Sequence, residues 1–322
     1  MRYRTFGRTG LEVSELGYGA WGIGKSLWKG ADDDESLRAL RRAVELGVNF
    51  IDTALAYGDG HSEALVGQVV RETPHPVYVA TKVPPQNGEW PARDGVPVGE
   101  VFPGAWVERC TERSLEHLGL DTVDVQQLHV WSDEWVGQGD WLETIERLKA
   151  EGKIRFFGVS INDHQPANAL RLIETGVVDT VQVIYNVFDQ SPEDDLFPAV
   201  EAADVGVIVR VPFDEGALTG NVRPDSTFPP GDFRNEYFAG ERKDEVWERV
   251  QGITGELGIP VERLPEIALR FCLSAPAVST VIAGMRSTRN VEANAAAVDA
   301  GPLPADELSV LRRHRWVRRF YA

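Results

Sequence analysis

The chain has 322 residues, of which 43% are hydrophobic and 26% charged, as in an ordinary globular protein with a large core. Its formal net charge is −17, so its surface repels phosphate backbones and anionic headgroups, and we expect it to bind neither nucleic acid nor membrane. A local arginine and backbone N–H groups could still bind an anionic cofactor.

The two cysteines, Cys110 and Cys272, both lie in stretches whose pattern predicts helices. No spacing indicates a disulfide framework or a metal site, which favours a reducing compartment. Residues 1–10 show no apolar run typical of a secretory signal, and no stretch approaches the roughly 20 apolar residues that a membrane span requires. We therefore expect a cytoplasmic protein without a metal.

Short apolar runs rich in Val and Ile predict eight strands, and amphipathic stretches between them predict helices. The strands are expected over residues 16–20, 48–52, 77–82, 123–129, 154–160, 181–185, 205–210 and 278–282. The helices are expected over residues 33–46, 62–71, 106–118, 141–150, 166–174 and 196–203.

Strands that alternate with helices indicate βαβ units and a parallel sheet. Eight such units with right-handed crossovers are the number that closes a (β/α)8 barrel, so we predict an α/β TIM barrel in one domain over residues 1–322. An open doubly wound sheet is the alternative. The cluster Gly17, Gly19 and Gly22 opens no helix, which the dinucleotide fingerprint of that fold requires.

Two long segments rich in Pro and Gly, residues 84–103 and 212–240, each follow a predicted strand. Loops longer than about 15 residues are usually functional or disordered. Loops after barrel strands lie on the active-site face, so we expect both segments to border the site rather than to be simple surface insertions.

Four polar residues stand at or just after the ends of consecutive strands. Asp52, Lys82 and His129 end three of them, and Tyr57 follows Asp52 by five residues. Because these strand ends converge on one barrel mouth, we expect the four side chains to meet there. An ammonium beside a phenol lowers the phenol pKa from its usual value near 10, so Tyr57 is a candidate general acid. Asp52 would orient Lys82, and His129 would hydrogen-bond the substrate oxygen.

Longer motifs resemble the aldo-keto reductase family over essentially the whole chain. The matching stretches are residues 50–54 with Tyr57-Gly58, Gly60 and Ser62-Glu63, residues 3–11 with Val13-Ser14, and residues 152–155 and 158–160. They correspond to the second strand and its turn, to an N-terminal hairpin that plugs the barrel bottom, and to the fifth strand. The resemblance implies Asp52, Tyr57, Lys82 and His129 as the catalytic set. It also implies hydride transfer between NADPH and an aldehyde or ketone, or the reverse on a sugar or alcohol.

The resemblance further implies a nicotinamide site. Ser160 and Gln182 match positions that hold the carboxamide, and Arg210 stands where many members place an aromatic side chain that stacks on the nicotinamide. Asn usually follows the matching Ser, whereas here Ile161 precedes Asn162.

Two other segments would hold the rest of the cofactor. Residues 212–220, with Pro212, Gly216, Leu218 and Gly220, resemble the segment that crosses the pyrophosphate, and a helix beginning near Gly216 would offer free N–H groups to it. The adenosine-end motif is matched by Gly284, Arg286, Asn290 and Asn294. Arg286 could pair with a 2′-phosphate, which favours NADPH over NADH.

Several features have ordinary interpretations. The acidic run 32–35 is expected to cap a helix rather than to bind metal. The Arg-rich segment 312–319 is expected in a terminal helix that pairs with the body of the protein or a neighbour. Trp21, Trp90 and Trp131 each follow a strand, and we expect them to wall the substrate pocket.

Two other functions remain open at this point. One is a nucleotide-sensing subunit with little turnover, because some members of the family partner with membrane channels. The other is a barrel lyase or aldolase in which Lys82 forms a Schiff base, although this leaves Tyr57 without a role. The substrate, the physiological direction and the oligomeric state are not predicted.

Overall fold

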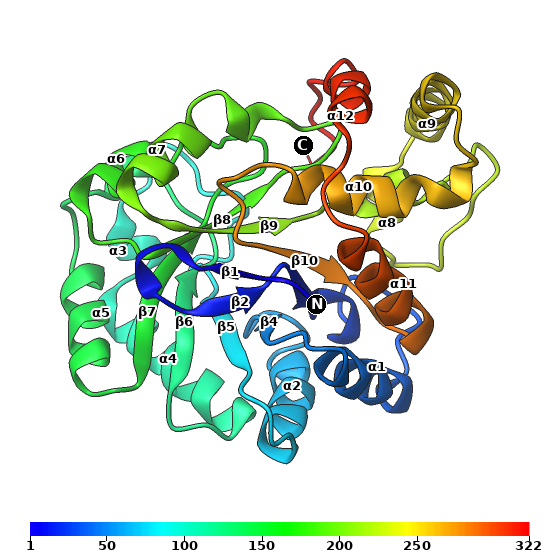
Figure 1. Cartoon of the computed structure of the whole chain (residues 1–322). Coiled ribbons are helices and arrows are strands. Elements are labelled where there is room, and N and C mark those ends of the chain that lie inside the picture. The colour runs from blue at the N-terminus through cyan, green and yellow to red at the C-terminus, as the bar shows by residue number, and fades with distance from the viewer. Residues whose placement is uncertain (322) are drawn as a thin grey trace.

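The computed structural model describes residues 1–321, in which eight parallel strands close into a barrel (Figure 1). These are β3 (Leu16–Gly19), β4 (Phe50–Asp52), β5 (Tyr78–Val83), β6 (Val123–Leu128), β7 (Ile154–Ser160), β8 (Thr180–Ile184), β9 (Gly206–Arg210) and β10 (Thr280–Gly284). Neighbours in the barrel follow chain order, and β10 closes it by pairing with β3 and β9. The predicted TIM barrel is therefore confirmed.

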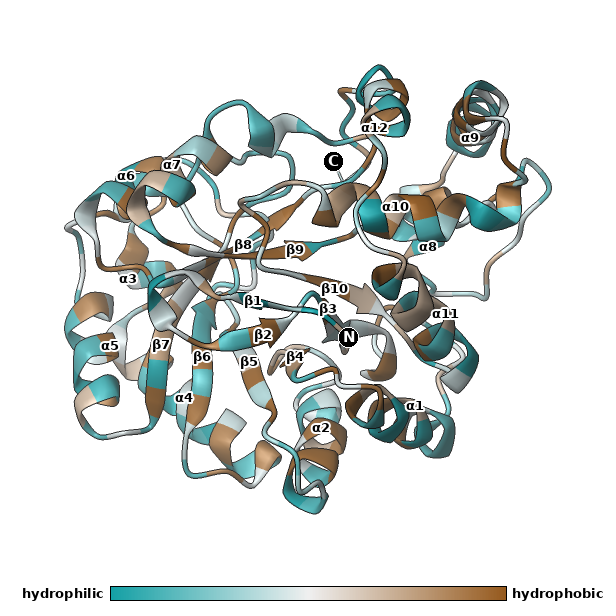
Figure 2. Ribbon diagram, in the orientation of Figure 1, coloured by the Kyte–Doolittle hydropathy of each residue, from teal (hydrophilic) through white to brown (hydrophobic). Residues whose placement is uncertain are grey.

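Helices surround the barrel, with hydrophobic residues along β9 and hydrophilic ones on the outer face of α1 (Figures 1 and 2). The longer ones are α1 (Asp33–Glu45), α2 (His61–Glu72), α4 (Gly104–Leu118), α5 (Trp141–Ala150), α7 (Leu196–Ala203), α9 (Arg242–Leu257), α10 (Leu264–Leu273), α11 (Thr288–Asp299) and α12 (Ala305–Arg312). Short helices are α3 (Val98–Val101), α6 (Leu170–Thr175) and α8 (Arg234–Tyr237). The helix predicted over 166–174 begins only at Leu170, because turns occupy residues 166–169.

The N-terminal hairpin closes the bottom of the barrel. Strands β1 (Tyr3–Thr5) and β2 (Glu12–Ser14) pair antiparallel, as predicted. Phe6, between them, is fully buried and packs edge-on against Phe50, the first residue of β4, with ring centroids 5.4 Å apart. Gly206, the first residue of β9, must be glycine, because a Cβ there would lie 2.4 Å from the Phe6 ring. The plug therefore fills the end of the barrel opposite the strand carboxyl ends.

The acidic run 32–35 and the Arg-rich segment 312–319 both form contacts within the fold. The Asp32 carboxylate accepts a 2.9 Å hydrogen bond from the N–H of Glu35 and caps α1. Within residues 1–321 no group of His, Cys, Asp and Glu could hold a metal ion. The Arg-rich segment 312–319 departs from the expected terminal helix, because α12 ends at Arg312 and a turn follows it. The expected pairing with the body of the protein is present, since Arg313 pairs with Glu256 of α9 at 2.6 Å and Arg315 pairs with Asp194. None of the helices in this part of the chain combines the length and apolar character needed to cross a membrane.

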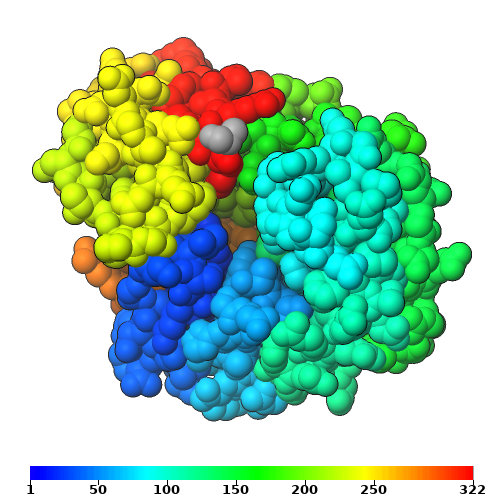
Figure 3. All heavy atoms as spheres, turned by 180° about the vertical axis from the view of Figure 1, so that it is seen from behind, coloured from blue at the N-terminus to red at the C-terminus, as the bar shows by residue number. Residues whose placement is uncertain are grey.

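A cavity of about 880 Å³ opens at the carboxyl ends of the strands. Its wall includes Trp21 after β3, Trp90 in the segment after β5 and Phe233 in the segment after β9. Figure 3 shows the hollow on this face, between the blue N-terminal part, the cyan part and the yellow part of the chain. Both long Pro- and Gly-rich segments therefore border the cavity, as expected.

Candidate active site

Asp52, Tyr57 and Lys82 meet at the floor of the cavity. Lys82 Nζ donates to Asp52 Oδ1 at 2.5 Å, to the carbonyl of Thr53 at 2.7 Å and to Tyr57 Oη at 3.3 Å. Asp52 ends β4, and the neighbouring β5 carries Lys82 two residues beyond the partner of Asp52. The turn after β4 then brings Tyr57 back over the ammonium. The acid, amine and phenol are therefore assembled as the strand order predicts.

Lys82 is fully buried, yet its amine remains charged. Burial alone lowers the pKa of an amine, but the Asp52 carboxylate and the hydrogen bonds to Asp52 and Tyr57 outweigh it, and the pKa of Lys82 lies above its ordinary value. A protonated amine with all three hydrogens engaged has no lone pair for attack on a carbonyl. This arrangement speaks against Schiff-base chemistry at Lys82.

Tyr57 differs from the expectation in one respect. Burial raises its pKa more than the neighbouring Lys82 charge lowers it, so the pKa of the phenol lies above its usual value. The phenol is therefore protonated in the resting protein. The Lys82 ammonium, whose Nζ lies 4.9 Å from the ring centroid, would stabilise a phenolate at this position.

His129 follows β6 and lies against Tyr57, with ring centroids 5.6 Å apart. Burial, together with the charges of Lys82 and Arg210, holds the pKa of His129 well below its usual range. The imidazole is therefore neutral at physiological pH. Its Nδ1 is buried with no hydrogen-bond partner in the described part of the chain, and the side chain lines the cavity. His129 can thus offer a neutral hydrogen bond to a bound molecule.

A second layer of amides holds Asp52. Gln182 Nε2 donates to Asp52 Oδ2 at 2.8 Å, and Gln127 Nε2 donates to the same oxygen at 3.1 Å. Gln182 also lines the cavity beside Ser160, where the resemblance places a carboxamide. The structure therefore gives Gln182 a role that the sequence did not indicate: it links the cavity wall to the charged pair beneath.

Arg210 lies at the same end of the cavity. Its Nη2 donates to Asp163 Oδ1 at 2.6 Å and to the carbonyl of Ile161 at 3.0 Å. Its Nε is buried, and no described residue accepts a hydrogen bond from it. Asn162 lines the cavity too and donates to the carbonyl of Ala92 at 3.0 Å. The Arg210 plane and its orphan N–H are thus available to a bound ring or carbonyl group.

The segment after β9 departs from its prediction. No helix begins at Gly216; instead a 3₁₀ turn spans Asp214–Thr219, with Glu215 and Gly216 in the left-handed region. Pro212 and Gly216 line the cavity. Leu218 lies outside its wall because its side chain is buried in the core, and Gly220 lies outside because it ends the turn against Val261.

At the far end of the cavity, Gly284, Arg286 and Asn290 line the wall. Asn294 does not, because it lies on the buried face of α11. Gly22 lets Arg286 approach closely, since a Cβ there would lie 2.8 Å from Arg286 Cδ. Burial and then the nearby Arg234 charge lower the pKa of Arg286, although a guanidinium stays charged at neutral pH.

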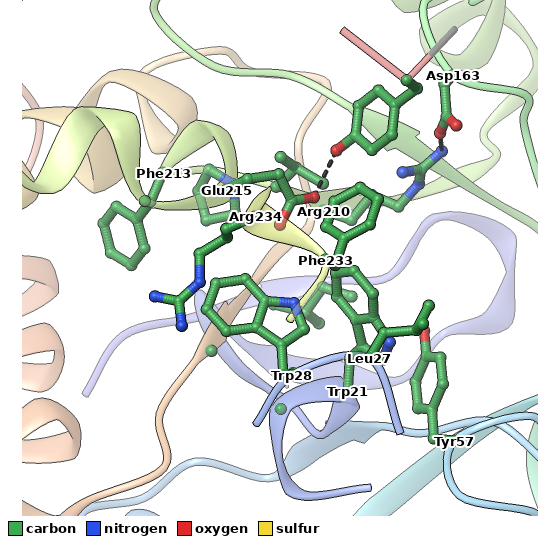
Figure 4. A pocket seen from close by; sticks show the side chains of 18 of the residues that line it. Trp21, Leu27, Trp28, Tyr57, Asp163, Arg210, Phe213, Glu215, Phe233 and Arg234 are labelled. Atoms are coloured by element: carbon green, nitrogen blue, oxygen red, sulfur yellow. Dashed lines mark hydrogen bonds and ion pairs between the residues drawn. The ribbon is translucent and has the colours of Figure 1, made fainter. Parts of the chain in front are cut away.

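Arg234 was not predicted. It stacks on Trp28, with Cζ 4.3 Å from the ring centroid, and Arg286 lies 5.6 Å from the same centroid. Figure 4 shows Trp28 and Arg234 beside one another, and Trp28 Nε1 is buried with no hydrogen-bond partner among residues 1–321. Arg234 already pairs with Asp232 at 2.8 Å. Arg286 and the indole N–H of Trp28 are therefore the donors at this end of the cavity that suit an anion such as phosphate.

Aromatic side chains wall the reacting end. Trp21 lies 6.4 Å from Tyr57 and 5.6 Å from Phe233 between ring centroids, and Trp90 lies edge-on to His129 at 4.4 Å. The prediction that Trp131 walls the pocket is wrong. Its side chain is fully buried outside the cavity wall and packs against Trp135 and Trp141, with ring centroids 5.7 and 5.3 Å apart. The chain after β6 turns outward at Trp131 and carries it into the helix layer.

Comparison with known proteins agrees with this geometry. The model of the aldo/keto reductase family matches residues 15–315. The chain is 29% identical to the aldo-keto reductase YhdN of Bacillus subtilis, over 91% of this chain and 87% of that one. It is 29% identical to a probable voltage-gated potassium channel subunit beta of Oryza sativa, over 96% and 94%. Among solved structures, the holo form of aldo-keto reductase AKR11C1 from Bacillus halodurans is 28% identical, with a TM-score of 0.76 and full coverage of both chains.

Proposed function

Since the chain belongs to the aldo/keto reductase family of oxidoreductases, which act on carbonyls or alcohols, we propose that it reduces an aldehyde or ketone with NADPH. The reverse oxidation of a sugar or alcohol uses the same groups. The observation that carries the proposal is the contact between Lys82 Nζ and Tyr57 Oη, 3.3 Å apart at the floor of an aromatic cavity beside a neutral His129.

The cavity fits a nicotinamide dinucleotide. Arg210, Ser160 and Gln182 line the reacting end, and Arg286 with Arg234 lines the other. The unpartnered buried N–H groups of Arg210 and Trp28 are donors that a bound molecule would satisfy. When bound, NADPH would supply the hydride that the carbonyl carbon receives.

The protein's own part is orientation and proton supply. Tyr57 Oη donates its proton to the carbonyl oxygen as that oxygen gains negative charge, which completes the alcohol. The Lys82 ammonium then stabilises the phenolate, and Asp52 holds the ammonium in place. The neutral His129 hydrogen-bonds the carbonyl oxygen and positions it near Tyr57. Trp21 and Trp90 exclude water from the reacting end.

The proposal is tested by titrating the purified protein with NADPH and NADH while following tryptophan fluorescence, and then adding 4-nitrobenzaldehyde. We expect NADPH to bind and the aldehyde to oxidise it, because Tyr57 and Lys82 are assembled for proton transfer. Absorbance of the reduced cofactor measures the oxidation. If NADPH binds but no carbonyl of a broad panel is turned over, a nucleotide-sensing role replaces the reductase, in line with the relative named as a channel subunit. Failure to bind either cofactor would refute both functions.

Arg286 is expected to set the preference for NADPH. Arg286→Ala should weaken NADPH binding about 10- to 100-fold, the effect of losing hydrogen bonds between charged groups, and should leave NADH binding nearly unchanged. The dissociation constants are measured by fluorescence titration. Arg289→Ala is the matched control, because Arg289 is an exposed arginine nearby on α11 outside the cavity wall. Equal losses for both cofactors would contradict a 2′-phosphate contact.

A further inference from the structure

The turn over residues 211–216 has an unusual backbone. Val211, Asp214 and Glu215 have φ values of 57°, 49° and 54°, and Gly216 follows at 104°. Residues other than glycine rarely adopt the left-handed backbone region, and a β-branched residue such as valine does so least readily. Such residues persist only where surrounding contacts hold them, and they gather at ligand sites.

The contacts that hold this turn come from the C-terminal tail. Arg318 forms an ion pair with Asp214, which also accepts a 3.0 Å hydrogen bond from Tyr237 Oη. Tyr321 Oη donates to Glu215 Oε1 at 2.5 Å. The tail is itself fixed, since Arg242 Nη1 donates to the carbonyl of Phe320 at 3.0 Å. The conformation of the turn therefore depends on residues about a hundred positions further along the chain.

Glu215 is the member of the turn whose carboxylate faces the cavity. It is only 6% exposed, and in Figure 4 it points into the cavity between Arg210 and Arg234. Asp163 already pairs with Arg210, and Arg318 already pairs with Asp214. Glu215 therefore has no cation of its own, and Tyr321 is its one hydrogen-bonded side chain in the described part of the chain.

Burial, more than any neighbouring charge, opposes the ionisation of Glu215. Burial is the largest effect and raises the pKa of Glu215, and the charges of Asp214 and Asp163 raise it further. The hydrogen bond from Tyr321 and the charge of Arg210 lower it, and the resulting pKa is about 7. Tyr237 and Arg318 both bind the carboxylate of the neighbouring Asp214. Glu215 is thus a carboxyl that can change charge near neutral pH inside the cavity.

We propose that Glu215 binds a proton when the dinucleotide binds, with Tyr321 as the residue that positions its carboxyl; this rests on the proposed function. Glu215 lines the cavity between Arg210 and Arg234, so a dinucleotide that reaches from Arg210 to Arg286 would bring its pyrophosphate close to this carboxyl. An ionised carboxylate there repels the phosphates, whereas a protonated one donates a hydrogen bond to them. Tyr321 keeps the carboxyl turned into the cavity in both states.

The proposal is tested on the whole protein by measuring the NADPH dissociation constant between pH 6.5 and 8.5. Protonated Glu215 becomes scarce above pH 7, so we expect the constant to rise roughly tenfold over this range. In Glu215→Gln, whose amide oxygen still accepts from Tyr321, the rise should be absent. Any pH dependence that comes from titration of NADPH itself should appear equally in Glu215→Gln, so the difference between the two proteins reports on Glu215. Calorimetry in two buffers of different ionisation enthalpy should show proton uptake at pH 8 that Glu215→Gln loses.

Two further variants separate positioning from general structure. Tyr321→Phe removes the hydrogen bond that favours the ionised carboxyl, so the pH at which NADPH affinity falls should shift upward, a change that a merely structural role would not produce. Glu193→Gln is the matched control. Its carboxylate accepts a 2.5 Å bond from Tyr185 outside the cavity wall, and its pH profile should match the parent protein.

The outcomes are distinct. NADPH binding with parallel pH profiles in the parent protein and Glu215→Gln would overturn the role of Glu215 and leave the reductase proposal standing. An unchanged midpoint in Tyr321→Phe would overturn the positioning role of Tyr321. Absence of NADPH binding in every protein at every pH would overturn the proposed function itself.

Discussion

Tyr57→Phe is expected to lower kcat about 10²- to 10⁴-fold, the usual contribution of a general acid, while the NADPH dissociation constant stays nearly the same. The phenol hydroxyl is the protonated group at the floor of the cavity, 3.3 Å from Lys82 Nζ. The phenyl ring retains the contacts with Trp21 and His129, so the cavity keeps its shape. Steady-state kinetics with 4-nitrobenzaldehyde and fluorescence titration with NADPH measure the two quantities.

Tyr18→Phe provides the matched control for this loss. Tyr18 is a fully buried tyrosine on β3, outside the cavity wall, and its hydroxyl has no hydrogen-bond partner in the described residues. Removing it deletes the same atom without touching the proposed proton donor, so kcat should not change. Turnover by Tyr57→Phe at the parent rate would assign the proton to another group, with His129 the nearest candidate.

The barrel was predictable because its strands are buried on both sides. Such strands appear as short runs of Val and Ile, and β7 occupies the residues expected for it. The helices after residue 234 carry weaker signals. In α10, for instance, seven of ten residues are buried, so the apolar pattern has little contrast between faces. Beyond residue 234 the sequence indicated only a helical stretch around Cys272 and a terminal helix in the Arg-rich segment, without bounds for the other helices.

The candidate site was predictable as far as it is tied to strand ends. Asp52, Lys82 and His129 end or follow consecutive strands, and parallel strands deliver such side chains to one mouth. Arg234 and Tyr321 come from a long connection and from the tail, and only tertiary contacts bring them to the cavity. The prediction for Trp131 was wrong although this residue closely follows a strand, because the chain turns outward there and buries its side chain away from the cavity.

Lys82→Met is expected to reduce the free energy of unfolding by about 3–5 kcal/mol, because removing one partner of a buried ion pair leaves the other charge uncompensated. Asp52 would remain buried, and the amides of Gln127 and Gln182 would be its only side-chain donors among residues 1–321. Turnover should fall as well, because no ammonium would stabilise the Tyr57 phenolate. Urea denaturation measures the stability, and kinetics with NADPH and 4-nitrobenzaldehyde measure turnover.

The double variant Asp52→Asn/Lys82→Met separates the two effects. It removes both charges, and an asparagine at position 52 still accepts from Gln182, so most of the lost stability should return. Turnover should not return, because the charge that supports Tyr57 is still missing. If the double variant recovered activity together with stability, Lys82 would be a structural residue and the phenol would transfer its proton unaided. Stability that stays low in the double variant would instead show that Lys82 contributes through packing and its bond to Thr53 rather than through its charge.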